Sequence, residues 1–292
     1  MGADPELAVA DFCQRICHYE KVYETISQDD CEQNYSFVKI FDVGSLVIIN
    51  RILDYRQSKI VFFLMNLHIK PRSIFIARHG ETTHNVAGKI GGDADLTEAG
   101  RKFAETLPEI IKHIYGDAPL TVWTSTLKRT MQTAQYLQCT KVQWKALDEI
   151  DAGVCDGLTY EQIEQQYPDD FALRDTDKFN FRYRGGESYA DLVLRLEPII
   201  MEVERQENVL IIGHQAVLRA ILAYFLDKRP DQLPYLKIPL HMVIQLTPRA
   251  YGCQVTHYRV GIDAVDTYRP KPGTVAPKSP ESINIPSPFP ET

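Results

Sequence analysis

Two short apolar runs, far apart in the chain, each end directly at a histidine. Residues 73–77 (SIFIA) precede Arg78, His79 and Gly80, and residues 208–213 (NVLIIG) precede His214. Short apolar runs of this kind are typical of strands that are buried on both faces of a parallel sheet. Because ligands bind beyond the carboxyl ends of such strands, we expect both histidines at the ligand-binding edge of one sheet.

The middle of the chain alternates between strand and helix patterns. A further strand is predicted over residues 120–124, and an amphipathic helix over 187–206, where apolar side chains recur at helical spacing. Other helices are predicted over 97–115, with Thr97 as N-cap, over 127–137 and over 216–226. This alternation predicts an α/β fold, with a mainly parallel sheet flanked by helices on both faces.

The 292 residues divide into three zones. Residues 1–71 hold two helix patterns, with two strand patterns (37–43 and 46–49) between them. Residues 72–262 hold the alternating strands and helices. Residues 263–292 include seven prolines from Pro270 onward, so we expect a disordered tail that buries too little apolar surface to fold.

Composition argues against several classes of function. The formal net charge of −7 disfavours a broad nucleic-acid interface, which needs a basic surface. No apolar run reaches the ~18 to 20 residues of a membrane span, and the first residues lack the features of a secretion or myristoylation signal. Six scattered cysteines suit free thiols in a reducing compartment, so we expect a cytoplasmic protein.

Cys13, Cys17 and His18 form a small cluster with the side chains of a metal site. Cysteines at positions i and i+4 share one face of a helix, but no second Cys/His pair follows nearby to complete a tetrahedral set. Small apolar side chains buried on a helix are the favoured interpretation. We therefore expect neither a metal nor a cofactor.

The three residues Arg78, His79 and Gly80 suit nucleophilic chemistry at phosphorus. The guanidinium of Arg78 offers a planar fork that matches phosphate oxygens, and Gly80 permits close backbone approach. Cationic neighbours lower the pKa of an imidazole, which keeps His79 neutral and nucleophilic. A single histidine after a strand is more often structural, so the second one, His214, strengthens the hypothesis.

Several separated segments then resemble one known family in the same order. Residues 78–82 (RHGET), followed by Asn85 and Gly91-Gly92, resemble the signature of the histidine phosphatase superfamily, which includes phosphoglycerate mutases. Residues 122–130 resemble the segment that brings a second phosphate-binding arginine, here Arg129, and Gly213-His214 resembles the second histidine. The resemblance implies a phosphoglycerate mutase-like fold.

Further segments point to one branch of that superfamily. Residues 144–155 (WKALDEIDAGVC), 206–219 and 222–227 resemble the fructose-2,6-bisphosphatase domain of the bifunctional 6-phosphofructo-2-kinase/fructose-2,6-bisphosphatase family, whereas a mutase would carry a Glu-Arg-His-Tyr-Gly type of sequence around its acid. The resemblance spans residues 6 to about 260. It implies that the chain hydrolyses fructose 2,6-bisphosphate to fructose 6-phosphate and phosphate through a phosphohistidine, and so regulates glycolysis and gluconeogenesis.

The resemblance also implies roles for individual residues. His79 is the nucleophile and Glu149 the proton donor and later base, while Arg78, Arg129 and His214 hold the transferring phosphoryl group. The sugar and its second phosphate are bound by a larger set, with no metal required: Asn85, Gly91, Tyr160, Arg174, Lys178, Tyr189, Gln215 and Arg219.

Residue spacing alone favours plainer interpretations of some of these residues. Tyr160 and Tyr189 are equally suited to amphipathic packing, and Glu149 to a surface position beside Asp148. The segment 171–184 offers four cations for a clamp, of which Arg182 and Arg184 also read as solvated loop charges.

Residues 1–71 resemble the last part of the kinase domain of the same bifunctional family. A kinase of this kind needs a G-x-x-x-x-G-K-[ST] loop to hold phosphates, and the sequence has none, so we expect no 6-phosphofructo-2-kinase activity. Two alternatives stay open: another phosphatase or mutase of the superfamily, and a non-catalytic fragment that binds a metabolite or partner subunit. The expected partner is a small sugar bisphosphate, and a homodimer is compatible with the sequence.

Overall fold

The computed structural model describes residues 5–26, 32, 34–42, 45–66, 72–249, 252–275 and 280–285. The chain forms two compact units, Met1–Leu67 and His68–Thr292. The first unit contains helix α1 (Pro5–Glu20), an antiparallel pair of strands, β1 (Phe37–Phe41) and β2 (Leu46–Asn50), and helix α2 (Tyr55–Met65). Asp54 caps α2 by accepting a hydrogen bond from the Gln57 amide.

The second unit is built on a seven-stranded sheet with the order β5-β4-β6-β3-β7-β8-β9. Strand β7 is antiparallel to both of its neighbours, and every other adjacent pair in this sheet is parallel. The mainly parallel α/β sheet predicted from the sequence is therefore confirmed. The strands are β3 (Ser73–Arg78), β4 (Thr121–Thr124), β5 (Thr140–Gln143), β6 (Asn208–Gly213), β7 (Met242–Arg249), β8 (Gly252–Val260) and β9 (Ile283–Ile285).

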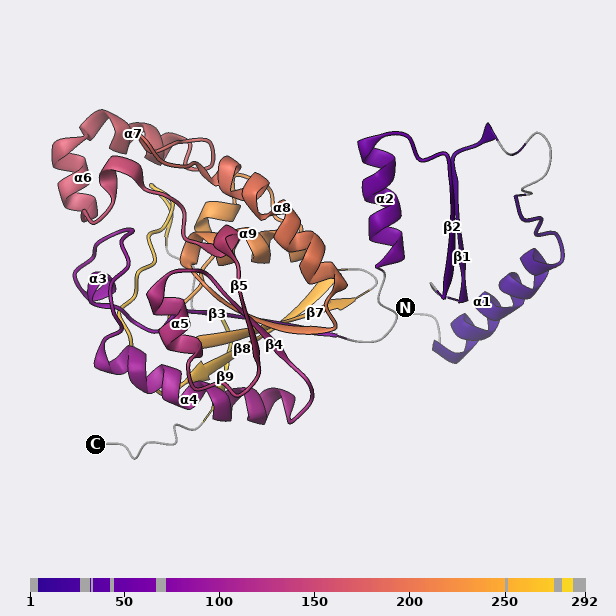
Figure 1. The fold of residues 1–292 in the computed structure, drawn as a ribbon, viewed down its shortest axis with the longest axis horizontal. Coiled ribbons are helices and arrows are strands. Elements are labelled where there is room, and N and C mark those ends of the chain that lie inside the picture. The colour runs from indigo at the N-terminus through magenta and orange to yellow at the C-terminus, as the bar shows by residue number, and fades with distance from the viewer. Residues whose placement is uncertain are drawn as a thin grey trace. The chain divides into compact units, whose positions relative to one another are not determined.

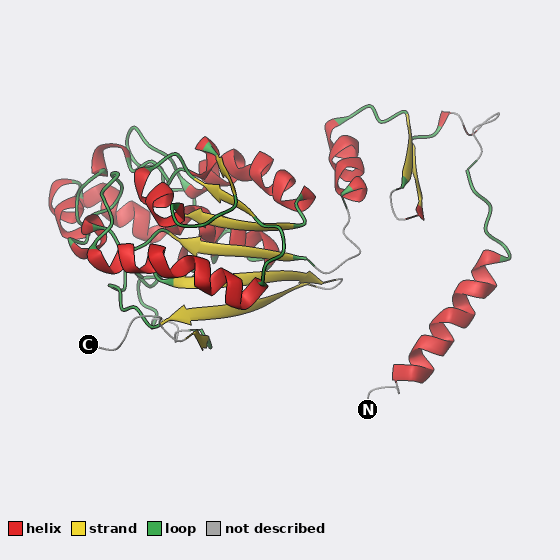
Figure 2. Ribbon diagram, turned by 60° about the horizontal axis from the view of Figure 1, so that its bottom comes forward, coloured by secondary structure: helices red, strands yellow, loops and turns green. Residues whose placement is uncertain are grey.

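Helices cover both faces of this sheet (Figures 1 and 2). Alternate residues of β3 face opposite ways: Ile74 and Ile76 pack with helices α8 and α9, and Phe75 and Ala77 pack with helix α4. The helices are α3 (Thr83–Val86), α4 (Glu98–Tyr115), α5 (Lys128–Ala134), α6 (Tyr160–Gln166), α7 (Pro168–Thr176), α8 (Tyr189–Arg205) and α9 (Gln215–Phe225).

The predicted central elements agree with the structure to within a few residues at their ends. Thr97 caps α4 as expected, by accepting a hydrogen bond from the Gly100 amide. Strands β7 and β8, within residues 242–260, are not predicted from the sequence. Many side chains of β8 are only partly buried, so its sequence lacks the continuous apolar run that marks β3 and β6.

The described part of the C-terminal segment, residues 263–275 and 280–285, differs from the disordered tail that its prolines predict, and the rest of that tail lies outside the described residues. Residues 283–285 form β9, which pairs with β8, and residues 263–269 make specific hydrogen bonds and ion pairs with the sheet and its loops. Composition reports the apolar surface that a segment can bury by itself. It does not report backbone pairing to an existing sheet edge, which orders this segment.

Candidate active site

The carboxyl ends of three adjacent parallel strands deliver the polar residues of the site. Arg78 at the end of β3 is in register with Gly213 at the end of β6, so the next residues, His79 and His214, lie side by side with ring centroids 5.3 Å apart. Strand β4 lies on the other side of β6 and is followed by Ser125. The sheet therefore brings both predicted histidines to one edge.

His79 is buried and its hydrogen bonds fix which nitrogen can react. Its Nδ1 lies 2.8 Å from the carbonyl oxygen of Gly80, which can only accept, so Nδ1 carries the proton and Nε2 has a free lone pair. Burial, followed by the charges of Arg129 and Arg78, holds the pKa of His79 well below its usual value near 6.5. The imidazole is therefore neutral at neutral pH and presents Nε2 as a nucleophile.

His214 is fully buried and both of its ring nitrogens are hydrogen-bonded to protein. The Nε of Arg129 donates to its Nδ1 (3.1 Å), so its Nε2 carries the proton and donates to the hydroxyl of Ser125 (2.8 Å). Ser125 also accepts from the Leu127 amide and lies 2.9 Å from the hydroxyl of Thr130. This network locks one neutral form of His214 and holds the guanidinium of Arg129 against it.

The two arginines nearest His79 keep donors that a phosphate could use. Arg78 donates from Nη1 to the carbonyl of Ile238 and to the hydroxyl of Thr267, while its Nε is one of three buried side-chain atoms without a hydrogen-bond partner in the described part of the chain. Burial lowers the pKa of Arg78 to about 10, so the group stays charged at neutral pH. Arg129 also donates from Nη1 to the carbonyl of Gly92.

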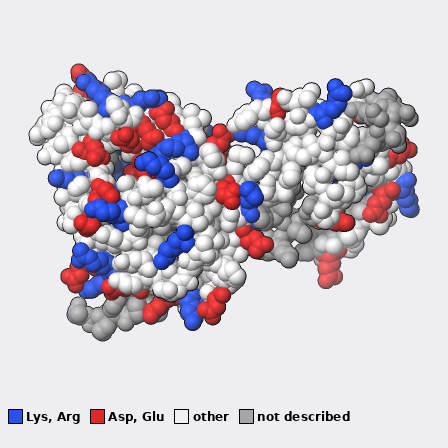
Figure 3. Space-filling view, viewed as in Figure 1, with Lys and Arg blue, Asp and Glu red and all other residues white. Residues whose placement is uncertain are grey.

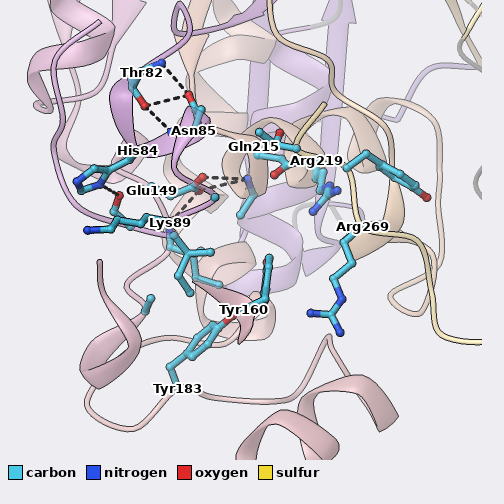
Figure 4. Close-up of a pocket in the computed structure, with 18 of the residues that line it drawn as sticks. Thr82, His84, Asn85, Lys89, Glu149, Tyr160, Tyr183, Gln215, Arg219 and Arg269 are labelled. Carbon is cyan, nitrogen blue, oxygen red and sulfur yellow. Dashed lines mark hydrogen bonds between the residues drawn. The ribbon is translucent and has the colours of Figure 1, made fainter. Parts of the chain in front are cut away.

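Glu149 lies at the amino end of helix α9. Its two carboxylate oxygens accept from the amide of Ala216 at 3.2 and 3.4 Å, and Oε1 also accepts from the amide of Ile150. Because His214 is the N-cap of the same helix, the carboxylate is held close to both histidines. Glu149 borders the cavity instead of lying on the plain surface (Figure 4). A general acid and base must lie within reach of the reacting group, and this position allows it.

A second group of cations lies at the far end of the cavity, among aromatic rings. Arg174 donates from Nε to the hydroxyl of Tyr183 and from Nη2 to that of Tyr160, whose ring its guanidinium also faces. Lys178 lies over the ring of Tyr235, at 4.7 Å from its centroid. Rings of this kind stabilise a buried cation and leave its remaining donors free to bind a ligand.

Arg219 and Tyr189 connect this group to helices α8 and α9. Arg219 donates from Nε to the carbonyl of Leu236 and from Nη1 to the hydroxyl of Tyr189. Tyr160 and Tyr189 are thus both packed and hydrogen-bonded to guanidinium groups. The alternative that they serve only amphipathic packing does not account for these contacts.

Residues of α3, of the loop that follows it and of α9 also border the cavity. Asn85 accepts from the amide and the hydroxyl of Thr82 and so forms a capping box for the short helix α3. Gly91 has φ +67°, and a Cβ there would lie 1.7 Å from Oδ1 of Asp156, so a side chain would break this approach. Gln215, the first residue of α9, also borders the cavity.

These groups surround a cavity of about 520 Å³. Of the thirteen residues proposed from the sequence, all but His214 line it, and His214 lies behind His79 and Arg129. Lys and Arg side chains gather here, while Figure 3 shows charges of both signs interspersed over the face it displays. The cations that could bind an anion are therefore gathered in the cavity rather than spread over a broad basic surface.

Other lining or supporting residues had no signal in the sequence. Ser125, Tyr183, Thr267 and Arg269 lie at or behind the cavity, and the last two belong to the segment expected to be disordered. Arg182 and Arg184 instead form exposed ion pairs with Asp191 and Asp170 and do not line the cavity. The cationic clamp expected over residues 171–184 is therefore reduced to Arg174 and Lys178.

The described residues contain no group of three or more His, Cys, Asp or Glu side chains placed to hold a metal ion. None of the helices in the described ranges is long and apolar enough to cross a membrane.

The site combines a neutral strand-end histidine, a second histidine and two buried arginines, an arrangement suited to phosphotransfer chemistry. Residues 74–261 match the family model of the histidine phosphatase superfamily (branch 1), and the chain belongs to this family. Residues 1–71 match the family model of 6-phosphofructo-2-kinase.

Individual relatives narrow the resemblance within the family. The chain is 54% identical over 270 residues to "Fructose-2,6-bisphosphatase" of Saccharomyces cerevisiae, covering 92% of this chain and 60% of that protein. It is 53% identical over 275 residues to human "6-phosphofructo-2-kinase/fructose-2,6-bisphosphatase 1", covering 94% of this chain and 58% of that protein. The chain thus spans little more than half the length of the curated relatives it matches.

Solved structures give the same fold. A mycobacterial glucosyl-3-phosphoglycerate phosphatase superposes with a TM-score of 0.53 at 26% identity, covering 61% of this chain and 91% of that one. The alpha-ribazole phosphatase of Shigella flexneri superposes with a TM-score of 0.56 at 21% identity, covering 63% of this chain and 94% of that one. At this identity the second comparison shows the fold alone.

Proposed function

We propose that the chain hydrolyses fructose 2,6-bisphosphate to fructose 6-phosphate and inorganic phosphate, with His79 as a transient phosphate carrier. The observation that supports this most strongly is the pairing of two cationic groups in one cavity. A reactive group surrounds His79, and a second group around Arg174, Lys178 and Arg219 is placed to hold another phosphate. A substrate with one phosphate would leave the second group without a counter-ion, which is costly for buried cations.

The first chemical step is transfer of the phosphoryl group to His79. The lone pair on Nε2 attacks phosphorus while the bond from phosphorus to the C2 oxygen of the sugar breaks. Nδ1 keeps its proton and its hydrogen bond to the Gly80 carbonyl, which stabilises the positive charge that develops on the ring. Arg78 and Arg129 donate to the equatorial oxygens of the transferring group.

Glu149 handles the proton in both steps. In the first step its carboxylic acid donates a proton to the departing sugar oxygen, which leaves as an alcohol. In the second step the carboxylate takes a proton from water, whose oxygen attacks the phosphohistidine and releases inorganic phosphate. Its place beside the Ala216 amide keeps the carboxyl group within reach of the space in front of His79.

Phosphate release from purified protein tests the proposal. We expect phosphate to appear from fructose 2,6-bisphosphate, with an acid-labile phosphoprotein trapped when the reaction is quenched after one turnover. A panel with phosphoglycerates and hexose monophosphates separates this substrate from those of other superfamily members. Absence of turnover of the sugar bisphosphate by a folded chain would reject the proposal, and phosphoryl transfer between two phosphoglycerates would favour the mutase alternative.

We further propose that residues 1–71 are part of a 6-phosphofructo-2-kinase domain and that residues 72–262 carry the phosphatase. The match of residues 1–71 to the kinase family supports the first assignment, and the sequence has no phosphate-holding G-x-x-x-x-G-K-[ST] loop that would support kinase activity. The described cysteines are free thiols, which suits a cytoplasmic location. A homodimer stays a prediction that light scattering can check.

A further inference from the structure

A short segment after β8 forms one wall of the active-site cavity. We call residues 263–269 the C-terminal strap. Three of its residues are fixed by polar contacts: Val265 donates its amide to Oε2 of Glu81 (2.9 Å), Thr267 accepts from Arg78 (2.7 Å) and Tyr268 donates its hydroxyl to a backbone carbonyl (3.2 Å). Four of its residues line the cavity: Asp266, Thr267, Tyr268 and Arg269.

The anchor of the strap lies in the same motif as the nucleophile. Glu81, two residues after His79, is buried, and its other oxygen accepts from the hydroxyl of Thr97 at 2.8 Å. A buried carboxylate is retained only where hydrogen bonds satisfy it, and the Val265 amide supplies one of them. The strap is therefore part of the built site rather than a loose end passing over it.

Arg269, the last residue of the strap, lies against the far group of cations. Its guanidinium faces the rings of Tyr160 and Phe171, at 4.7 and 4.6 Å from their centroids. Its Nη2 is 3.0 Å from Oδ2 of Asp175, whose Oδ1 is 3.2 Å from Arg174. The carboxylate of Asp175 and the ring of Tyr160 thus each contact the guanidiniums of both Arg174 and Arg269.

The charges around this point do not balance. Arg174, Lys178, Arg219 and Arg269 border the cavity, and Asp175 is the acid that pairs with two of them. Glu161, Glu164 and Asp266 also border the cavity, but these three acids are exposed to solvent, which screens their charge. Burial, followed by the charges of these three arginines, holds the pKa of Lys178 well below its usual value. Arg174, Lys178 and Arg219 are buried and Arg269 is partly buried, so positive charge is in surplus at this end of the cavity. An anion relieves such a surplus, and a phosphate dianion with three acceptor oxygens fits several donors at once.

We propose that Arg269 is a further ligand for the phosphate that is not transferred, and that the C-terminal strap makes the enzyme selective for substrates carrying a second phosphate. This inference rests on the proposed function and deepens it by adding a residue to the distal phosphate site. The strap presents Thr267 to Arg78 at one end and Arg269 to the distal cations at the other. It thereby spans both phosphate sites.

The test compares one substitution on two substrates. Arg269→Gln is measured with fructose 2,6-bisphosphate and with p-nitrophenyl phosphate, which has no second phosphate, using Lys271→Gln as the matched control because Lys271 follows on the same segment and is exposed. Loss of a charge-assisted hydrogen bond predicts a KM for the sugar bisphosphate raised roughly 10- to 100-fold. We expect kcat to change less than about 3-fold, and kcat/KM for p-nitrophenyl phosphate to stay within about 2-fold. Arg269→Lys, which keeps the charge but not the fork, should restore part of the lost affinity.

Each other outcome overturns the inference. An unchanged KM for the sugar bisphosphate means that Arg269 does not contact the second phosphate, and equal losses on both substrates mean that it acts only in folding. If the unaltered chain does not hydrolyse fructose 2,6-bisphosphate, the proposed function fails separately. The distal site is then tested by inhibition of p-nitrophenyl phosphate hydrolysis by fructose 6-phosphate, where an unchanged inhibition constant in Arg269→Gln rejects the role of Arg269.

Discussion

The two ends of the cavity are built in different ways. At the reactive end, His79 and His214 follow directly on buried strands, and their nitrogens bond to a carbonyl, a hydroxyl and a guanidinium. At the distal end, Arg174 and Arg269 come from a helix and from the C-terminal strap, and are held by aromatic rings and one carboxylate. The reactive end fixes proton positions, whereas the distal end gathers charge.

The two ends should therefore control different quantities: the rate of the chemical step and the affinity for the substrate. In the proposed mechanism every phosphate ester transfers its phosphoryl group to His79. Changes at the reactive end should therefore alter the chemical step for every substrate. Changes at the distal end should alter affinity only for substrates that reach it. Experiments that compare a sugar bisphosphate with a small phosphate ester therefore test whether the two ends have these separate functions.

The largest effect is expected from His79→Ala. Removing the nucleophile should abolish the phosphoprotein and reduce turnover of both substrates by roughly 10⁴-fold or more, since no other group can carry the phosphate. The measurements are phosphoprotein trapping and phosphate release. His113→Ala, an exposed histidine on α4, is the control and should behave as the unaltered chain. If the His79 variant still forms a phosphoprotein, another residue is the nucleophile.

Glu149→Gln should separate the two proton transfers. Loss of general acid–base catalysis commonly costs ~10²- to 10⁴-fold, so steady-state hydrolysis of the sugar bisphosphate should fall within that range. The p-nitrophenolate group leaves without a proton, so single-turnover phosphorylation from p-nitrophenyl phosphate should be nearly unchanged while dephosphorylation slows. Phosphoprotein should then accumulate. Equal slowing of phosphorylation from both donors would show that Glu149 only supports the shape of the site.

Ser125→Ala should have a smaller effect, confined to the reactive end. The substitution removes the acceptor for Nε2 of His214, so the imidazole that holds Arg129 is no longer fixed. We expect the phosphorylation rate to fall roughly 10-fold with both substrates. Ser125→Thr keeps a hydroxyl and should recover most of the rate. Inhibition by fructose 6-phosphate, which reports the distal end, should not change in either variant. A shift in that inhibition would contradict the division between the two ends.

The smallest expected signal is a proton taken up at the distal end. The pKa of Lys178 is held well below its usual value by burial and by three arginines, so its ammonium group loses a proton more readily than that of a free lysine. A bound phosphate favours the ammonium form, which raises the pKa and draws up to about one proton from solution. Calorimetry of fructose 6-phosphate binding in buffers of different ionisation enthalpy measures this uptake. Lys178→Arg should remove it, and uptake that persists in that variant would assign the proton to another group.

The reactive end could be predicted almost completely from the sequence. An apolar run that ends at a histidine reports both the strand and the place of its last residue, because β3 and β6 are buried on both faces. The position of Glu149 is harder to predict, because its carboxylate is held by the amide of Ala216, which is 67 residues away in the chain. The resemblance to the family carried that assignment, and spacing alone did not.

The strap shows where sequence reasoning fails. A run of prolines lowers the expectation of a packed core. It says nothing of single polar contacts to an existing fold, such as the bond from Val265 to Glu81. Arg182 and Arg184 form ion pairs with Asp191 and Asp170 outside the cavity, which agrees with their interpretation as solvated loop charges.

The route of the strap has a practical consequence for anyone who shortens this chain. A fragment that stops at residue 262, close to where the family match ends, would retain both histidines, Glu149 and every strand-end motif. It would nevertheless lose the hydroxyl that meets Arg78, the guanidinium that meets Asp175, and the outermost strand β9. Such a fragment would carry the full signature and, under the proposed function, would lose selectivity for substrates with two phosphates, so expression boundaries should extend past Ile285.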